Sequence, residues 1–466
     1  MYTSKKSLPR SRFLVGDLYY MASADRKSVV VVFRAKDFNH IEFTIPSSIR
    51  YGEREYPVIE IAYCAFAHIE MLETVFIPDS ILKIGRSAFD TCNALSTVSI
   101  GKNVMEIAGS AFNNCESLTN VIISNDNPNF SFDDGVLFNK SKTKLLKCFS
   151  NKKGAYFIPI SVREINDWAF YKCSSITSIS IPPFITTFGQ KVFYGCVSLF
   201  EINWNAKFYV NFTYDTNHQY NPFSDIAHII KSIKFGAGVE HIPAYICFGM
   251  KNLKSINIPL NVTTIGTRAF YDCTSLESVT LGDKLKSIGD EAFYRCSSLK
   301  NIEIPSNVER FGFNAFVGSS ISQLTIPSSV TNIEEGAFNC CHSLIAINVD
   351  DANEKYSSAD GILFDKSRST IIKYPQALRK NVYSIPNGVI KILDNAFGNE
   401  FLKRISIPKG VKYIGLSSEQ WLYFEQITFR GTMNEFKAIK KYTIHSYERD
   451  KSVVIHCCDG DVEYIN

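Results

Sequence analysis

The chain of 466 residues lacks any long apolar segment. No hydrophobic run approaches the ~20 residues that a membrane-spanning helix requires, so no membrane-spanning segment is predicted. The basic N-terminus is not followed by the apolar stretch of a signal peptide, and none is expected. The sequence also lacks an excess of one charge, because 50 Lys and Arg face 46 Asp and Glu, a net charge of +4. Without a basic stripe, nucleic acid is not an expected partner.

Motifs that carry chemistry are missing as well. The sequence contains no G-x-x-x-x-G-K-[ST] phosphate loop, no H-E-x-x-H and no G-x-S-x-G. Its eight histidines are scattered, and only His456-Cys457-Cys458 forms a dense set of soft ligands. An edge strand with one buried and one outward cysteine is the simpler interpretation, with zinc as the alternative. The sequence therefore predicts no catalytic residue, no cofactor and no metal site, and a protein that is not an enzyme.

The sequence does contain a repeat, in which Ala-Phe recurs every 22 or 23 residues apart from three longer gaps. Six residues after most copies follows L-x-x-[IV]-x-[IVL], whose alternating apolar residues predict a short strand. The A-F-x-x-C-x-x-L stretch is expected to form a turn and one or two helical turns. The repeat phenylalanines are Phe66, Phe89, Phe112, Phe170, Phe270, Phe293, Phe316, Phe338 and Phe397, and the pairs Val192-Phe193, Cys247-Phe248 and Pro222-Phe223 are assigned to the same slot.

A unit of ~23 residues cannot bury its own apolar face, so neighbouring units must stack. The sequence therefore predicts an α/β repeat solenoid, a leucine-rich-repeat horseshoe with parallel β-strands and short helical or 3-10 returns. A flexible tail is expected over 1–12 and a β-rich N-terminal cap over 13–57. The solenoid is expected over 58–426, with about 12 repeats of ~23 residues, and a C-terminal cap over 427–466.

Two further positions repeat with the phenylalanine. Cysteine stands three residues after it in seven units, and a ladder of small buried side chains is favoured over disulfides or metal binding. The ladder cysteines are Cys92, Cys115, Cys173, Cys196, Cys273, Cys296 and Cys341. Tyrosine follows the phenylalanine directly at Tyr171, Tyr194, Tyr271 and Tyr294. Stacking between neighbouring units is expected for these rings, with sugar or protein binding as the alternative.

Two of the longer gaps contain matching inserts, near 126–158 and 350–385. Both contain Asp-Gly, an apolar cluster and Asn/Asp-Lys-Ser, at 134–141 and 360–367. Apolar clusters on both sides of this polar turn predict a β-hairpin. A calcium loop would need five or more oxygen ligands at set spacing, which these segments lack.

The third gap contains an aromatic insert near 204–220. Packing of the insert and its aromatic side chains against a flank of the solenoid is the favoured interpretation. A binding role is the alternative, because loops on rigid scaffolds often carry binding and aromatic side chains supply contact energy. The candidate binding residues are Phe208, Tyr209, Phe212 and Tyr214. Trp204, at a strand position, is expected in the core.

Units of the form I-G-x-x-A-F-x-x-C-x-x-L-x-x-[IV]-x-I-P resemble the BspA-like leucine-rich-repeat family, from about Val58 to Pro408. The flanks are similar too, since Phe13–Tyr56 resembles the β-rich N-terminal cap of bacterial members and 427–460 their closing segment. The resemblance implies a surface protein that adheres to host proteins or other cells, without catalytic residues or cofactors.

These features predict a non-enzymatic protein-binding or adhesion solenoid that attaches to host or cell-surface proteins, at the cell surface or after secretion. A carbohydrate-binding surface module is an alternative, motivated by the aromatic insert and the repeated tyrosines. An intracellular protein-interaction scaffold is a second alternative, because the chain shows no signal peptide and a cytoplasmic location therefore stays open. A third alternative is an enzyme or metalloprotein without a recognisable motif, which is suggested by the aromatic insert and by His456-Cys457-Cys458.

Overall fold

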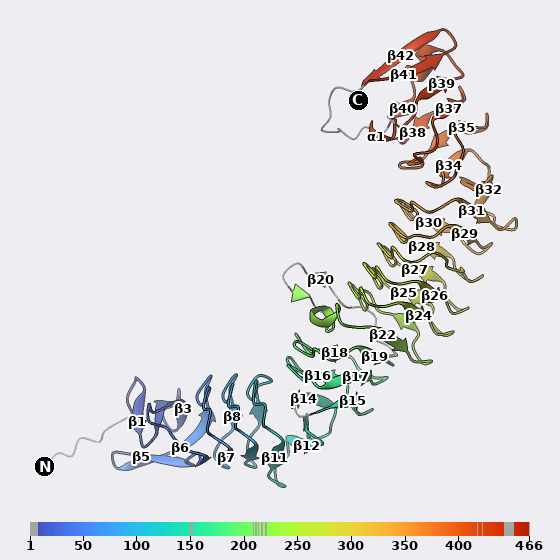
Figure 1. Ribbon diagram of the computed structural model, residues 1–466. Helices are drawn as coiled ribbons and strands as arrows, with labels where there is room; N and C mark the ends of the chain where they lie inside the picture. The colour runs from blue at the N-terminus through green and yellow to red at the C-terminus, as the bar shows by residue number, and fades with distance from the viewer. Residues whose placement is uncertain are drawn as a thin grey trace. The chain divides into compact units, whose positions relative to one another are not determined.

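A computed structural model describes residues 8–149, 152–207, 209, 212, 214–215, 218–219, 221–416, 418–421, 423–441 and 452–465. The chain forms two compact units. Unit 1 comprises Met1–Phe208 and Tyr214–Ile229, and unit 2 comprises Tyr209–Thr213 and Ile230–Asn466. Both are β-solenoids with parallel strands and almost no helix, and together they contain about 16 turns (Figure 1).

Each regular turn of unit 1 supplies one strand to each of two parallel sheets. In the first sheet Thr74 of one turn pairs with Thr97 of the next, and in the second Lys83 pairs with Glu106. First-sheet strands are β4 (Glu42–Thr44), β7 (Thr74–Ile77), β9 (Thr97–Ile100) and β11 (Asn120–Ile123), which form one sheet, and β15 (Gly154–Phe157), β17 (Ile176–Ile181) and β19 (Glu201–Trp204), which belong to a separate sheet further along the chain. Second-sheet strands are β6 (Arg54–Ile61), β8 (Lys83–Ile84) and β10 (Glu106–Ile107) in one sheet, and β14 (Lys144–Cys148), β16 (Glu164–Ile165) and β18 (Thr187–Phe188) in a separate sheet later in the chain.

The N-terminal segment of unit 1 is made of strands. β1 (Phe13–Val15), β2 (Leu18–Ala22) and β3 (Val29–Arg34) are antiparallel neighbours, and β3 pairs in parallel with β6. β5 (Ser48–Tyr51) forms a hairpin with β6. That this segment acts as a cap stays a prediction. The remaining elements are β12 (Phe130–Asp133), β13 (Val136–Asn139), β20 (Tyr214–Asp215), β21 (His218–Gln219) and the 3-10 turn η1 (Ser224–Ile226).

Unit 2 repeats the same plan. Its first-sheet strands are β22 (Ser232–Phe235), β24 (Ser255–Asn257), β26 (Ser278–Thr280), β29 (Gln323–Ile326), β31 (Ala346–Val349), β35 (Val382–Ser384), β37 (Arg404–Ile407), β39 (Gln426–Phe429), β41 (Ser452–Cys457) and β42 (Gly460–Ile465). Its second-sheet strands are β23 (His241–Ile242), β25 (Thr264–Ile265), β27 (Ser287–Ile288), β28 (Arg310–Phe311), β30 (Asn332–Ile333), β34 (Thr370–Lys373), β36 (Lys391–Ile392), β38 (Tyr413–Ile414) and β40 (Lys440–Lys441). The remaining elements are β32 (Tyr356–Ala359), β33 (Ile362–Asp365), α1 (Ser418–Trp421) and α2 (Met433–Lys437).

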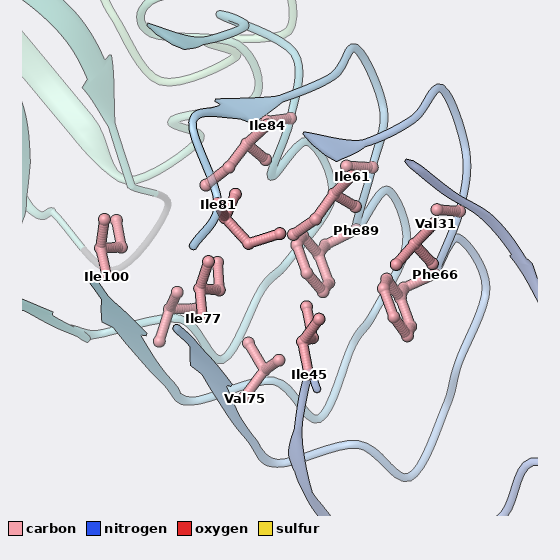
Figure 2. Packing of buried hydrophobic residues seen from close by; sticks show 14 of the residues in the cluster. Val31, Ile45, Ile61, Phe66, Val75, Ile77, Ile81, Ile84, Phe89 and Ile100 are labelled. Carbon is pink, nitrogen blue, oxygen red and sulfur yellow. The ribbon is translucent and has the colours of Figure 1, made fainter. Parts of the chain in front are cut away.

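The hydrophobic core lies between the two sheets and the turns that connect them. Alternate strand residues face inward, so Val75 and Ile77 of β7 are buried together with Ile84 of β8 and Phe89 of the following turn (Figure 2). Phe89 stacks on Phe66 of the preceding turn with ring centroids 5.2 Å apart. Each turn therefore buries its apolar face mainly against its neighbours, as the repeat predicted.

The returns that contain Ala-Phe are turns rather than the expected helical or 3-10 segments, within the part of the chain that the structure describes. Left-handed residues bracket the phenylalanine, as Ser87 (φ 52°) and Thr91 (φ 60°) do around Phe89, and interrupt any right-handed helix. The backbone N–H of Phe89 donates to the carbonyl of Ala111 in the next turn, 2.8 Å away. Hydrogen bonds between turns thus replace the bonds within a helix.

The assignment of Phe248 to the repeat slot was wrong by one residue. The backbone N–H of Cys247 donates to the carbonyl of Ala269, as that of Phe270 donates to Ala292 in the following turn. Cys247 therefore occupies the phenylalanine slot, and Phe248 stacks on Tyr271 with centroids 4.9 Å apart. Phe223 was assigned correctly, because it stacks on Phe193 at 5.2 Å.

The two matching inserts, near 126–158 and 350–385, each form three antiparallel strands, β12–β13–β14 in unit 1 and β32–β33–β34 in unit 2. Asp-Gly makes the first turn of each insert, and both of its residues are left-handed, with φ of 46° and 76° at 134–135 and of 52° and 79° at 360–361. Two left-handed residues are typical of a tight hairpin turn. The last strand of each insert then joins the second sheet of its unit.

The ladder cysteines lie in the core, and their thiols hydrogen-bond to the backbone. Cys92 Sγ donates to the carbonyl oxygen of Phe66, 3.0 Å away in the preceding turn, and Cys115 Sγ donates to that of Phe89 at the same distance. Burial raises the pKa of the Cys92 thiol to about 11. These thiols act as small buried side chains that connect neighbouring turns.

Candidate functional site

The turns of unit 1 carry a surface of aromatic and basic side chains. Tyr171 and Tyr194 stack between neighbouring turns as expected, with centroids 5.7 Å apart. The indole of Trp168 lies 5.1 Å from the ring of Tyr171 and 6.0 Å from that of Tyr194. The ammonium of Lys191 is 5.3 Å from the rings of Trp168 and Tyr194, and that of Lys172 is 5.4 Å from Tyr171. These five residues are called the unit 1 aromatic patch, and Tyr194 is exposed within it.

Unit 2 has a related surface with a different charge arrangement. Phe248, Tyr271 and Tyr294 stack in series, at 4.9 and 4.7 Å between centroids. Arg268 lies 5.5 Å from the ring of Tyr271, and its guanidinium donates hydrogen bonds of 2.6 and 3.1 Å to the carboxylate of Glu291. Within the described residues Lys172 and Lys191 form no such ion pair. In that part of the chain the positive charges of Lys172 and Lys191 in the unit 1 patch are therefore not neutralised by a carboxylate, whereas that of Arg268 in unit 2 is.

A polar cavity of about 630 Å³ adjoins the unit 1 aromatic patch. Trp168 and Tyr171 contribute to its wall, together with the carboxylates of Asp90 and Asp167. Asp90 accepts a hydrogen bond from the side-chain amide of Asn114, 2.8 Å away, and Asp167 accepts one from a backbone N–H at 2.7 Å. Both carboxylates are thus held in place beside the aromatic rings.

The last strand of each insert buries a lysine at an equivalent position. In unit 1, Lys147 Nζ donates to Asn113 Oδ1 at 2.5 Å and to the carbonyl of Trp168 at 3.1 Å. In unit 2, Lys373 Nζ donates to Asn339 Oδ1 at 3.0 Å and to the carbonyl of Asn395 at 2.8 Å. The two acceptors of each lysine belong to the regular turns before and after the insert, so each ammonium joins turns that the insert separates.

Both lysines are 5% exposed. Burial lowers the pKa of each ammonium to about 8, because the charged form loses its hydration. Each lysine lines a cavity, of about 260 Å³ at Lys147 and about 240 Å³ at Lys373. These are called the Lys147 cavity and the Lys373 cavity.

The four candidate residues of the aromatic insert differ in their placement. Phe208 lies outside the described residues, as does the side chain of Tyr214, whose backbone pairs with Gln219. Phe212 is buried, and its N–H donates to the carbonyl of Ala244, 3.3 Å away. Tyr209 is half-buried with its ring 4.7 Å from that of Phe212, and burial raises the pKa of its hydroxyl to about 12. The burial of Phe212 agrees with the favoured packing interpretation for that residue.

The C-terminal soft-ligand set lies on β41 and just after it. His456 pairs with Asp461 of β42, Nδ1 to Oδ1 at 2.9 Å, and Cys458 is exposed. Among the residues that the structure describes, no three His, Cys, Asp or Glu side chains lie close enough together to hold a metal ion. No helix among them is long and apolar enough to cross a membrane.

Sequence reasoning missed the two buried lysines, although a pattern for one of them exists. Leu145 and Lys147 stand two residues apart on β14, as Ile371 and Lys373 do on β34, so each lysine shares a strand face with a buried apolar residue. On β34 this alternation of burial could have placed Lys373 inside, whereas on β14 every residue from Leu145 to Cys148 is buried and alternation gives no such signal for Lys147. The Asp-Gly pairs could likewise have indicated the first turn of each insert.

The chain is similar to a known family over most of its length. The family described as "BspA type Leucine rich repeat region (6 copies)" matches residues 42–147, 146–229, 216–345 and 377–457. No curated protein matches the sequence.

Solved structures of bacterial leucine-rich repeat proteins are similar as well. One from Bacteroides ovatus is 20% identical with a TM-score of 0.50, and the match covers 93% of this chain and 100% of that one. One from Eubacterium ventriosum is 20% identical with a TM-score of 0.36, over 66% of this chain and 94% of that one. A leucine rich cell surface protein from Faecalibacterium prausnitzii is 19% identical with a TM-score of 0.21, over 92% and 97%. The first likeness supports the solenoid fold.

Proposed function

Because the chain belongs to the BspA type leucine-rich-repeat family, whose members are commonly protein-interaction or surface proteins, we propose that it is an adhesion protein that attaches to host or cell-surface proteins. Proteins of this family are usually secreted or at the cell surface, and leucine-rich-repeat proteins are generally not enzymes. The proposed location is therefore the cell surface, and the proposed activity is binding without catalysis.

The observation that carries the proposal is the unit 1 aromatic patch. Stacked rings with ammonium groups beside them are well suited to protein contacts, because tyrosine and tryptophan bury large areas at little conformational cost. The backbone hydrogen bonds between turns hold Tyr171 and Tyr194 in position before any partner arrives, which lowers the ordering cost of binding. Tyr209 of the aromatic insert is a further proposed contact.

Affinity capture tests the proposal. The purified chain would be immobilised and exposed to extracts of extracellular-matrix and cell-surface proteins, and bound species identified by mass spectrometry. We expect a specific partner whose capture falls at least tenfold with Tyr194→Ala, since hot-spot truncation costs about 2 kcal/mol or more. Tyr294→Ala, in the related surface of unit 2, is the matched control. Capture that is unchanged by Tyr194→Ala would refute the patch as the binding site.

A second candidate function is carbohydrate binding, which the polar cavity beside Trp168 favours. Carboxylates that accept hydrogen bonds from hydroxyl groups, next to an aromatic face, match the chemistry of a sugar ring. A glycan array separates the two functions. A glycan signal lost with Asp167→Asn and Trp168→Ala would favour sugar binding, whereas a partner in the capture experiment without any glycan signal would favour protein binding.

A further inference from the structure

We propose that the Lys147 cavity binds a carboxylate, supplied by a glutamate or aspartate side chain of the protein partner. The inference rests on the proposed protein-binding function and adds a chemical requirement for the partner. It also distinguishes the Lys147 cavity from its counterpart in unit 2, which we infer attracts anions less.

The first argument is the hydrogen-bonding capacity of Lys147. An ammonium group has three N–H donors. Two of them are used, by Asn113 Oδ1 and the carbonyl oxygen of Trp168. Among the described residues no third acceptor is hydrogen-bonded to Nζ, and no carboxylate forms an ion pair with it. A buried cation without a counter-ion is costly, so an incoming carboxylate would gain a charge-assisted hydrogen bond and offset that cost.

The second argument is the composition of the Lys147 cavity. Lys172 provides a second positive charge at the exposed rim, where its Nζ donates to Asn114 Oδ1, 2.8 Å away. One acid, Glu116, also lines the cavity, and it is exposed. The lysines therefore outnumber the carboxylates at this place, which favours an anionic guest.

The third argument is the shape and the walls of the Lys147 cavity. Its volume of about 260 Å³ is several times the share of one liquid water, which is about 30 Å³. The rings of Phe112, Phe149 and Tyr171 supply apolar walls. Apolar walls around a cationic end fit the methylene stem and the carboxylate of an acidic side chain better than they fit a fully hydrated inorganic anion.

The Lys373 cavity has an equivalent buried lysine but a less positive charge balance. Lys391 supplies a second ammonium, but Glu334, Glu335 and Asp394 line the same cavity. Glu334 is ion-paired with Arg310 at 3.5 Å, so the charges at this cavity nearly balance. An anionic side chain would therefore be attracted less here than at the Lys147 cavity. Lys373 is therefore a built-in control for the effect of a buried lysine alone.

Calorimetric titration of the full chain tests the proposal, with the blocked peptide N-acetyl-Gly-Glu-Gly-amide as the probe and its glutamine counterpart as the neutral control. We expect saturable binding of the glutamate peptide only, weakened at least tenfold by Lys147→Met and unchanged by Lys373→Met. No saturable binding, equal binding of the glutamine peptide, or an equal loss with Lys373→Met would each overturn the proposal. Free acetate that competes as tightly as the peptide would overturn its assignment to a protein side chain.

Lys172→Met keeps the measurement informative if Lys147→Met fails to fold. Lys172 is exposed at the rim of the Lys147 cavity, so its replacement leaves the core intact and should weaken the glutamate peptide several-fold. Circular dichroism would check the fold of each variant. An unchanged affinity in Lys172→Met would contradict the charge argument. If Lys147→Met left the capture of a protein partner unchanged, this inference would be overturned and the adhesion function would remain. If the glutamate peptide bound but no protein partner were captured, the adhesion function would be overturned and the carboxylate site would remain.

Discussion

The two inserts place the same three strands in two different chemical surroundings. Lys147 and Lys373 make matching hydrogen bonds and have similarly lowered pKa values. The residue that follows each lysine differs, because Cys148 fills the phenylalanine slot in unit 1 and Tyr374 fills it in unit 2. The cavities differ in charge as well. The shared backbone therefore fixes where the lysine lies, while the neighbouring side chains decide what each site can bind.

The largest expected effect concerns the phenylalanine slot. Tyr374→Ala should cost about 3–5 kcal/mol of unfolding free energy, like Phe293→Ala in a regular turn, because both remove a fully buried ring. Cys148→Ala should cost only about 1 kcal/mol, since far less volume is lost. Denaturant titration measures all three. If Phe293→Ala unfolded like the wild type, the assigned repeat register would be wrong.

A second prediction tests how far the inserts share their backbone. Asn127 and Asn353 are fully buried and hold the chain where each insert begins. The side chain of Asn353 donates to the carbonyls of Pro327 and Val330 and accepts from two backbone N–H groups, and Asn127 makes the matching set. Alanine at either position should cost about 3 kcal/mol, because several buried groups lose their partners. Unequal losses of unfolding free energy in denaturant titration would show that Asn127 and Asn353 do not have the same role in the two inserts.

The lysines predict a pH dependence with a definite sign. The folded pKa is about 8 and the ordinary value is 10.5, so between these pH values the unfolded chain binds more protons than the folded chain. Stability should therefore rise with pH across this window, on the order of 2 kcal/mol per lysine, relative to a Lys147→Met/Lys373→Met double variant. Urea titrations at pH 7.5 and pH 10 would measure it. If the unfolding free energy of the wild type relative to the double variant fell between pH 7.5 and pH 10, the burial of these ammonium groups would be contradicted.

The smallest expected effect concerns the hydroxyl of Tyr374. It is buried, and it has no hydrogen-bond partner within the described residues. Tyr374→Phe keeps the ring that stacks on Phe397 at 5.0 Å and removes the unpaired group. The variant should be more stable than the wild type by about 1 kcal/mol. A melting temperature below that of the wild type would indicate a partner for this hydroxyl.

Much of the fold could be predicted from residue spacing alone. The period of 22 or 23 residues and the alternation of L-x-x-[IV]-x-[IVL] determined the stacked units and the first-sheet strands, since burial of one strand face depends on local pattern. The cysteine ladder and the tyrosine stacks follow from the same spacing, because equivalent residues of neighbouring turns must lie side by side. For example, Tyr271 and Tyr294 stack with centroids 4.7 Å apart.

The tertiary structure decided what spacing alone does not reveal. The returns lost their expected helices because backbone groups such as the N–H of Phe89 bond to the next turn, a partner that is distant in sequence. Lys147 became a buried cation because the insert brought Asn113 and Trp168 to either side of it, 34 and 21 residues away. The sequence by itself therefore determined the repeat and its core, which depend on neighbours at fixed intervals. Only the fold determined the sites at the interruptions, where the neighbours come from across a gap.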